Sequence, residues 1–338
     1  MRASYQSHQL VFKKPSGTSR GVMTNKPTWF LKLWDEENPT IIGIGECSPL
    51  PGLSIDNLEN FEAKLQAVCK SLEDDCPLPD GIAYYPSIVF GIEQALLDLA
   101  NGGQQILFPS AFTEGEDAII INGLIWMGSK SDMLQQINEK LDKGFRCLKL
   151  KIGSLDFETE LGILQYIRQQ YSESNLTLRV DANGAFSPQE ALDKLNRLAA
   201  LHIHSIEQPV KAGQWQEMAA LCKATPIPIA LDEELIGIQD SIEMYKLLES
   251  IQPQYIILKP SLLGGFGKGK KWIGLANQMG IGWWITSALE SNVGLNAIAQ
   301  WTYTLRNTLP QGLGTGQLYR NNLPSKLDLK GEKLWYRA

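Results

Sequence analysis

The fold is decided by five stretches of sequence: CLKLKIG (147–153), LRVDANG (178–184), HSIEQP (204–209), IALDEE (229–234) and YIILKPS (255–261). Each is a short apolar run typical of a β-strand, and each carries charge at its end. The charged positions recur every 25 to 30 residues: Lys151, Asp181, Glu207, Asp232 and Lys259. A strand, a helix and two short loops need about that length in a repeating β/α unit. The interval therefore predicts a parallel barrel with these side chains at one end.

Further apolar runs continue this rhythm. IIINGLIWM (119–127) precedes the series, whereas WWITSALES (283–291) and GLGTGQL (312–318) follow it as an uncharged strand and a last short strand. Helical segments separate the runs, which gives eight strands and seven intervening helices. This order predicts an α/β fold, namely a (β/α)7β TIM-like barrel over residues 113–315 that carries the active site.

The first 112 residues do not follow the β/α rhythm. One segment, SIVFGIEQALLDLANG (87–102), has the apolar spacing of a helix. Other runs are typical of strands in an antiparallel meander, at 4–13, 28–35 and 41–50. We therefore expect an α+β capping domain over residues 1–112, completed by about residues 316–338, which pack back on it.

Composition narrows the class of protein. Of the 338 residues, 43% are hydrophobic and 20% charged, which is ordinary for a globular protein with a sizeable core. The net charge of −6 argues against nucleic acid as a partner, because phosphate binding needs a basic field. No run has the length of a membrane helix, the N-terminus lacks the apolar core of a signal peptide, and the five cysteines form no CxxC pair. We expect a cytoplasmic protein with no membrane or nucleic-acid partner.

Three acidic residues end consecutive strands of the predicted barrel: Asp181, Glu207 and Asp232. Neighbouring carboxylates in a dry site stay ionised only if a cation neutralises them. Hard oxygen ligands, with no cysteine in the series, favour Mg²⁺, or else Mn²⁺, over zinc. The sequence therefore predicts a metal site at the barrel mouth.

Lysines flank the predicted metal site. Lys151 is expected to face Lys259 across the barrel mouth, and Lys149 shares the face of Lys151 because alternate strand residues point the same way. A lysine beside another ammonium group and a divalent cation has a lowered pKa, so Lys151 can act as a base near neutral pH. Arg179 and Asn183 share the face of Asp181, and Arg179 is expected either to support the acids or to contact substrate. The reaction indicated is removal of a proton α to the carboxylate of a small anionic substrate.

The order K-x-K, D-x-N, E-x-P, D-E, K resembles the enolase superfamily in its muconate-lactonising branch, over essentially the whole chain. The resemblance implies that the three acids bind Mg²⁺ and that Lys151 and Lys259 flank the substrate. It also implies supporting contacts from Asn183 and Glu233 behind the groups that touch metal and substrate.

Three stretches resemble the dehydratases of menaquinone synthesis within that branch: GECSPLPGLS (45–54), TSALESNVGLNAIAQW (286–301) and GLGTGQL (312–318). The implied reaction is a syn dehydration of a cyclohexadiene carboxylate bearing a succinyl chain, which yields an aromatic ring. Lys151 would remove the α-proton and return it to the leaving hydroxide, and Lys259 would lie over the ring face. The implied contacts to the succinyl carboxylate are the loop at Gly264 and the backbone around Ser287 and Ser291. The cap segment 17–24 would close over the site.

Other functions remain to be separated from this one. A racemase or epimerase of the same branch would use both lysines as bases. Dipeptide epimerases carry acids where this chain has Gly314, Thr315 and Gly316, but an N-succinylamino acid racemase stays open. The segment GGFGKGKK (264–271) nearly matches a phosphate-binding loop but lacks Ser or Thr after its lysine. A barrel that only binds a ligand is disfavoured because every charged position of the series is present.

Overall fold

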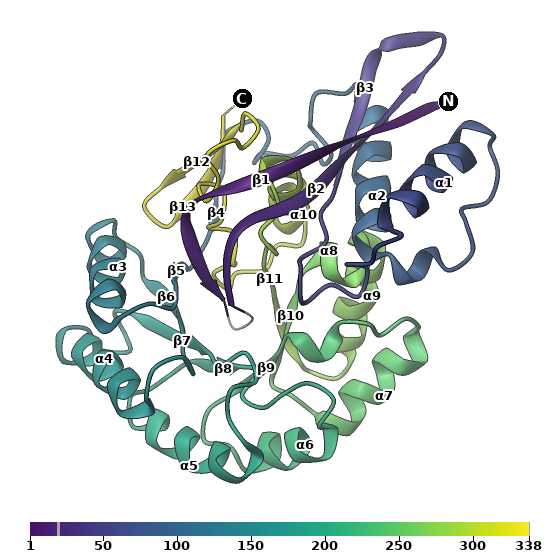
Figure 1. The fold of residues 1–338 in the computed structure, drawn as a ribbon. Helices are drawn as coiled ribbons and strands as arrows, with labels where there is room; N and C mark the ends of the chain where they lie inside the picture. Colours follow the sequence, from purple (N-terminus) through teal and green to yellow (C-terminus); the bar gives the residue numbers. More distant parts are fainter. Residues whose placement is uncertain (19–20, 338) are drawn as a thin grey trace.

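The structure is a computed structural model that describes residues 1–18 and 21–337 (Figure 1). Its N-terminal part is an antiparallel sheet in the order β1-β2-β3, with β1 at Arg2–Thr18, β2 at Gly21–Asp35 and β3 at Asn38–Cys47. Two helices follow, α1 (Phe61–Glu73) and α2 (Pro86–Ala100), joined by a 3₁₀ turn at Ile82–Tyr84. The predicted meander and helix are therefore present.

Helix α2 lies very close to β3. A Cβ added to Gly45 would lie 1.9 Å from the carbonyl oxygen of Gly91, and one added to Gly91 would lie 2.3 Å from the sulfur of Cys47. Only glycine permits this approach of helix to strand. The contact fixes the end of β3, from which the chain runs toward the barrel mouth.

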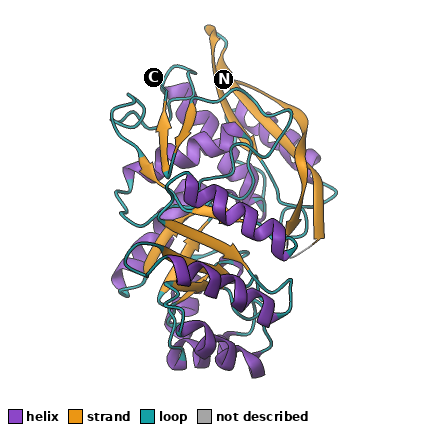
Figure 2. Ribbon diagram, turned by 90° about the vertical axis from the view of Figure 1, so that its left-hand side faces the viewer, coloured by secondary structure: helices purple, strands orange, loops and turns teal. Residues whose placement is uncertain are grey.

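The barrel is a parallel sheet in the order β11-β10-β9-β8-β7-β6-β5, with helices around its outside (Figures 1 and 2). Its strands are β5 (Gly123–Ile125), β6 (Cys147–Lys151), β7 (Thr177–Asp181), β8 (Ser205–Glu207), β9 (Ile229–Leu231), β10 (Tyr255–Leu258) and β11 (Gly282–Ile285). The intervening helices are α3 (Lys130–Asp142), α4 (Phe157–Gln170), α5 (Pro188–Ala199), α6 (Trp215–Ala224), α7 (Ser241–Ile251), α8 (Pro260–Leu263), α9 (Gly265–Gln278) and α10 (Asn292–Thr304). The predicted capped, TIM-like α/β barrel is confirmed.

Two predicted strands differ from the structure. Residues 119–127 form two short strands in different sheets, β4 (Ile119–Ile120) and β5, with Ile121 and Asn122 between them. The last barrel strand is reduced to Gln311 and Gly312, which bridge Ile121 and Thr286. Residues 314–317 form a turn, so the strand predicted over 312–318 is wrong there. The two bridging residues still close the barrel between its first and last strands.

The C-terminal segment joins cap and barrel. Strands β12 (Leu327–Lys330) and β13 (Lys333–Tyr336) form a sheet with β4 in the order β12-β13-β4. Before them, Tyr319 bridges Phe12 of β1, and Arg320 N donates to Val11 O at 2.8 Å. The segment therefore contacts the N-terminal sheet at Val11 and Phe12 and pairs with β4 further along the chain.

The glycine and lysine segment at 264–271 does not form a phosphate-binding loop. From Gly265 onward it is helix α9, and Glu93 of α2 accepts hydrogen bonds from the first backbone N–H groups of that helix, including Gly267 N at 3.1 Å. These donors are therefore already satisfied, which removes the nucleotide-binding alternative.

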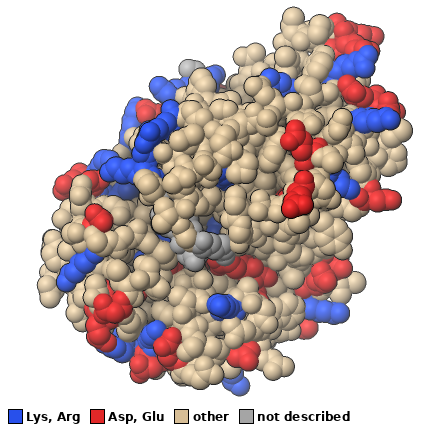
Figure 3. Space-filling view, viewed as in Figure 1, with Lys and Arg blue, Asp and Glu red and all other residues tan. Residues whose placement is uncertain are grey.

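Two general properties concern the length of the helices and the charge of the surface. In the part of the chain that the structure describes, no helix is long and apolar enough to cross a membrane. Acidic and basic side chains are both spread over the face shown in Figure 3. The net charge of −6 agrees with this mixture.

Candidate active site

Register brings the predicted residues to one edge of the sheet. Lys151 pairs with Asp181 across β6 and β7, and Asp181 pairs with Glu207 across β7 and β8. Asp232 and Lys259 directly follow the last residues of β9 and β10. All five therefore lie at the carboxyl ends of parallel strands, where active sites of such barrels form.

Ammonium groups lie between the buried carboxylates. Lys149 Nζ is 2.9 Å from Asp181 Oδ2 and also contacts Glu207. Lys259 Nζ is 3.7 Å from Glu207 Oε1 and also contacts Asp232. Because all three acids are at most 2% exposed, each charge needs this compensation.

The close charges shift the pKa values of these groups in opposite directions. Burial and the charge of Asp181 raise the pKa of Glu207 to about 8. Burial also acts on Asp181, but Lys149 and the other lysines outweigh it and hold the pKa of Asp181 well below its usual range. Burial would lower the pKa of Lys259, but Asp232 and Glu207 outweigh it and raise that pKa instead. The ion pairs with Asp232 and Glu207 therefore favour the protonated form of Lys259 in this structure.

The acids have the chemistry of a divalent metal site. Both carboxylate oxygens of Glu207 are buried and accept no well-aligned hydrogen bond within residues 1–18 and 21–337, so only ion pairs balance them. Among those residues, no three acidic, histidine or cysteine side chains already converge on one point, because the ammonium groups of Lys149 and Lys259 lie between the acids. Three hard oxygen donors with an orphaned carboxylate at their centre suit Mg²⁺ or Mn²⁺.

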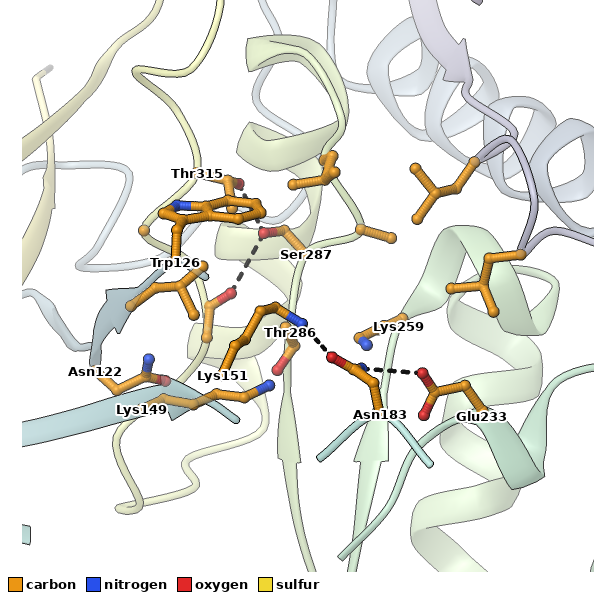
Figure 4. Close-up of a pocket in the computed structure, with 17 residues that line it drawn as sticks. Asn122, Trp126, Lys149, Lys151, Asn183, Glu233, Lys259, Thr286, Ser287 and Thr315 are labelled. Carbon is orange, nitrogen blue, oxygen red and sulfur yellow. Dashed lines mark hydrogen bonds between the residues drawn. The ribbon is translucent and has the colours of Figure 1, made fainter. Parts of the chain in front are cut away.

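Lys151 is held at the edge of this cluster (Figure 4). Its Nζ donates to Asn183 Oδ1 at 2.8 Å and lies 3.1 Å from Asp181 Oδ2. Asn183 in turn donates from Nδ2 to Glu233 Oε1 at 3.0 Å. The predicted supporting residues, Asn183 and Glu233, thus form a chain of hydrogen bonds that fixes the amino group of Lys151 toward the pocket.

A pocket opens above the lysines, with about 750 Å³ of space free of protein atoms when the open solvent at its mouth is included. Lys149, Lys151 and Lys259 lie at its base. Apolar groups form much of the remaining wall: Leu50, Leu53, Leu124, Trp126, Ala288 and Leu289. Ser287 and Thr315 add hydroxyl groups that bond each other at 2.7 Å. A small molecule with a charged end and an apolar body matches this lining.

The three acids lie below the described lining of this pocket, and three residues predicted to contact or support the substrate lie away from it. Arg179 is buried inside the barrel, where its guanidinium stacks on Trp284 at 4.1 Å and donates to Pro310 O at 2.8 Å. Gly264 lies at the junction of α8 and α9, and Ser291 is buried against the cap. Arg179 therefore packs in the barrel interior, and its contacts there are with neither the three acids nor the described pocket lining.

The cap segment predicted to close over the site, 17–24, lies partly outside the described residues, which omit positions 19 and 20. Positions 17–18 and 21–24 belong to β1 and β2, which pair there with each other. The predicted closure stays a prediction.

Several pocket residues carry no charge and were not singled out from the sequence. Trp126 follows β5 directly and is held by Gln136, whose Oε1 accepts from Trp126 N at 2.8 Å. Asn122 and Thr286 sit beside the closing bridges of the barrel. Trp126 and Thr286 directly follow β5 and β11, and this position was a usable signal, because pocket residues of such barrels come from the carboxyl ends of the strands.

Comparison with known proteins agrees with this geometry. Residues 132–333 match the family model described as enolase C-terminal domain-like. The chain is 49% identical to the o-succinylbenzoate synthase of Desulfotalea psychrophila over 98% of each chain. The crystal structure of MenC from that organism matches with a TM-score of 0.89 and 46% identity over 99% of each chain. An N-succinylamino acid racemase of Thermus thermophilus is 34% identical, but over 49% of this chain and 42% of its own.

Proposed function

The chain belongs to the enolase superfamily, and from that premise we propose that it is an o-succinylbenzoate synthase. It would dehydrate 2-succinyl-6-hydroxy-2,4-cyclohexadiene-1-carboxylate to o-succinylbenzoate, a carbon–oxygen lyase reaction of menaquinone biosynthesis. The observation that carries the proposal is the placement of Lys151 and Lys259 at the base of one pocket, beside three buried carboxylates. Similarity over the whole chain to a synthase of that name supports the choice of substrate.

The proposed metal site uses Asp181, Glu207 and Asp232, with Mg²⁺ as the preferred ion. When bound there, the divalent cation would supply positive charge that stabilises the substrate carboxylate as negative charge builds on it. Side chains of this protein carry out the remaining steps of the proposed mechanism.

Lys151 is the proposed base. Asn183 and Asp181 hold its Nζ at the pocket edge, where it would take the proton α to the substrate carboxylate. The electron pair of the broken C–H bond moves toward the carboxylate and gives an enediolate. As the pair returns to the ring, the hydroxyl on the neighbouring carbon leaves, and Lys151 returns its proton to form water. The ring becomes aromatic, which makes the second step strongly favourable.

Lys259 is the proposed cationic partner. Asp232 and Glu207 raise its pKa, so it stays protonated while negative charge is spread over the ring. Its ammonium group lines the same pocket, where it can lie against the face of the planar intermediate. Leu50, Leu53 and Trp126 would exclude water from the reacting carbon. We also place the enzyme in the cytoplasm, acting on a small carboxylate with no nucleic-acid or membrane partner.

A second candidate is N-succinylamino acid racemisation. Two lysines at one pocket could exchange the α-proton from opposite faces, and a racemase of this kind shares 34% identity over part of the chain. In this reading Lys259 must lose its proton, although its ammonium group is paired with Asp232 in the structure. Dehydration needs one base and one cation, so it agrees better with the unequal surroundings of the two lysines.

The test is to incubate the protein and Mg²⁺ with the cyclohexadiene substrate and to measure o-succinylbenzoate by mass spectrometry. A parallel reaction holds N-succinylamino acids in heavy water, where racemisation would exchange the α-hydrogen for deuterium. The proposal expects the aromatic product at a rate well above that of exchange. Exchange without dehydration would replace it with the racemase assignment.

A further inference from the structure

A buried carboxylate of the cap, Glu46 in β3, is bonded to the barrel loop that lines the pocket. Its Oε1 accepts from Ser291 N at 2.8 Å and from Thr28 Oγ1 at 2.9 Å. Its Oε2 accepts from Ser291 Oγ at 2.5 Å and from Gly294 N at 2.8 Å. Glu46 has no exposed surface. Four donors on one buried carboxylate make a rigid link between two parts of the chain far apart in sequence.

The barrel loop that Glu46 holds is strained. Leu289 lies in the pocket wall with a φ of +63°, a conformation that a leucine rarely adopts. Its carbonyl oxygen accepts from Tyr319 Oη at 2.7 Å, and Ala288 N donates to Glu290 Oε2 at 2.7 Å. Such a conformation persists only where the surroundings fix it, and Glu46 fixes the loop at its C-terminal end.

Glu46 also begins the cap segment on the other side of the pocket. Four and seven residues after it, Leu50 and Leu53 contribute to the wall. Leu50 packs in one apolar cluster with Leu289. The same carboxylate therefore connects the cap wall with the barrel wall, whereas Lys151 and Lys259 rest on strands that do not depend on it.

We propose that Glu46 is a positioning residue that sets the distance between the cap wall and the barrel wall of the substrate pocket. Because the walls contact the non-reacting part of the substrate, Glu46 acts on substrate affinity and leaves the proton transfer largely unchanged. This inference rests on the proposed function for its kinetic readout.

The chain offers a matched control in Glu93. This residue is also a cap carboxylate that accepts backbone N–H groups at the start of a barrel helix, here Phe266 and Gly267 of α9. It is not among the described residues that line the pocket. The variants Glu46→Gln and Glu93→Gln both replace an acceptor oxygen with an NH₂ group that faces donors, so both lose cap-to-barrel bonds.

The experiment measures KM, kcat and thermal unfolding for the wild type and both variants with the cyclohexadiene substrate. Glu46→Gln is expected to raise KM about tenfold, the scale of losing one or two charge-assisted hydrogen bonds, with kcat changed less than about threefold. Glu93→Gln is expected to lower the melting temperature while KM stays within about twofold of the wild type. Equal KM values for the two variants would overturn the proposal.

Two further measurements apply if Glu46→Gln does not fold or if the wild type turns over no substrate. If Glu46→Gln does not fold, Ser291→Ala removes one hydroxyl donor to Glu46 and is expected to raise KM by a smaller factor, about threefold; an unchanged KM would overturn the proposal. If the wild type turns over no substrate, the proposed function fails, and hydrogen exchange of residues 287–294 decides the positioning role. Faster exchange there in Glu46→Gln than in Glu93→Gln supports it, and equal exchange refutes it.

Discussion

The substitution Lys151→Ala removes the amino group that we assign as the base. In the structure this group is held by Asn183 Oδ1 at 2.8 Å and Asp181 Oδ2 at 3.1 Å, and its side chain is 15% exposed at the pocket edge. Truncation to alanine leaves Asp181 paired with Lys149, so each of the three acids keeps at least one positive charge beside it. The variant is therefore expected to fold, with stability lowered by only about 1 kcal/mol.

The expected loss of rate follows from the absence of a substitute base. Lys149 is engaged by Asp181 and Glu207, and Asp232 holds Lys259 as a cation. Removal of a positioned general base costs about 10²- to 10⁴-fold in rate, and the lack of a neighbouring amine puts this case at the upper end. We expect kcat to fall about 10⁴-fold, which corresponds to a loss of about 5 kcal/mol of transition-state stabilisation.

The assay follows formation of o-succinylbenzoate at saturating Mg²⁺, and calorimetry measures Mg²⁺ binding to the same variant. Affinity for Mg²⁺ should equal or exceed that of the wild type, because a positive charge near the acids is gone. Lys151→Arg provides the control for charge: it keeps a cation but cannot release its proton, so it should also be inactive. A Lys151→Ala variant that keeps more than about a tenth of the wild-type kcat would refute the assignment of the base.

Three further predictions test the metal site, a buried histidine and the packing of the barrel. Glu207→Gln removes the central carboxylate and should weaken Mg²⁺ binding at least about tenfold by calorimetry, with an unchanged circular dichroism spectrum; undiminished affinity would contradict the ligand assignment. Burial and the nearby positive charge of Arg179 lower the pKa of His204 from its ordinary value of 6.5 to about 4, so the unfolded chain binds the proton more tightly. The contribution of neutral His204 to the free energy of unfolding is therefore complete above pH 6.5 and is lost as the pH falls toward 4. Urea titrations of His204→Gln should lack this loss of about 2 kcal/mol; parallel curves of stability against pH for the variant and the wild type would contradict it. In α9, a Cβ on Gly269 would lie 2.6 Å from the Trp301 ring, whereas one on Gly274 meets nothing within 4 Å. Gly269→Ala should therefore lower the melting temperature, whereas Gly274→Ala should raise it, because alanine favours a helix over glycine by about 0.5 to 1 kcal/mol. The reverse order of melting temperatures would contradict the packing.

The charged series could be predicted because a strand has a period of two and a β/α unit has a nearly fixed length. These two regularities place Asp181 beside Glu207 without any knowledge of the loops, and the register of β7 and β8 has this pairing. The resemblance to a known superfamily then added the substrate, which spacing alone could not supply.

Contacts between distant segments could not be predicted. Glu46 and Ser291 are 245 residues apart, and nothing in the local pattern of either stretch indicates that they meet. The division of residues 119–127 into two strands was missed for a similar reason: IIINGLIWM is mostly apolar, and only pairing with the C-terminal strand β13 separates β4 from β5. Tertiary pairing, rather than local propensity, decides both features.

The central claim is that this pocket dehydrates the cyclohexadiene carboxylate with the help of a divalent cation. The most direct measurement is the rate of o-succinylbenzoate formation by protein stripped with a chelator, before and after Mg²⁺ is returned. The account predicts no turnover in the stripped protein and full recovery with Mg²⁺. Undiminished turnover in the stripped protein, or no product at any Mg²⁺ concentration, would contradict it.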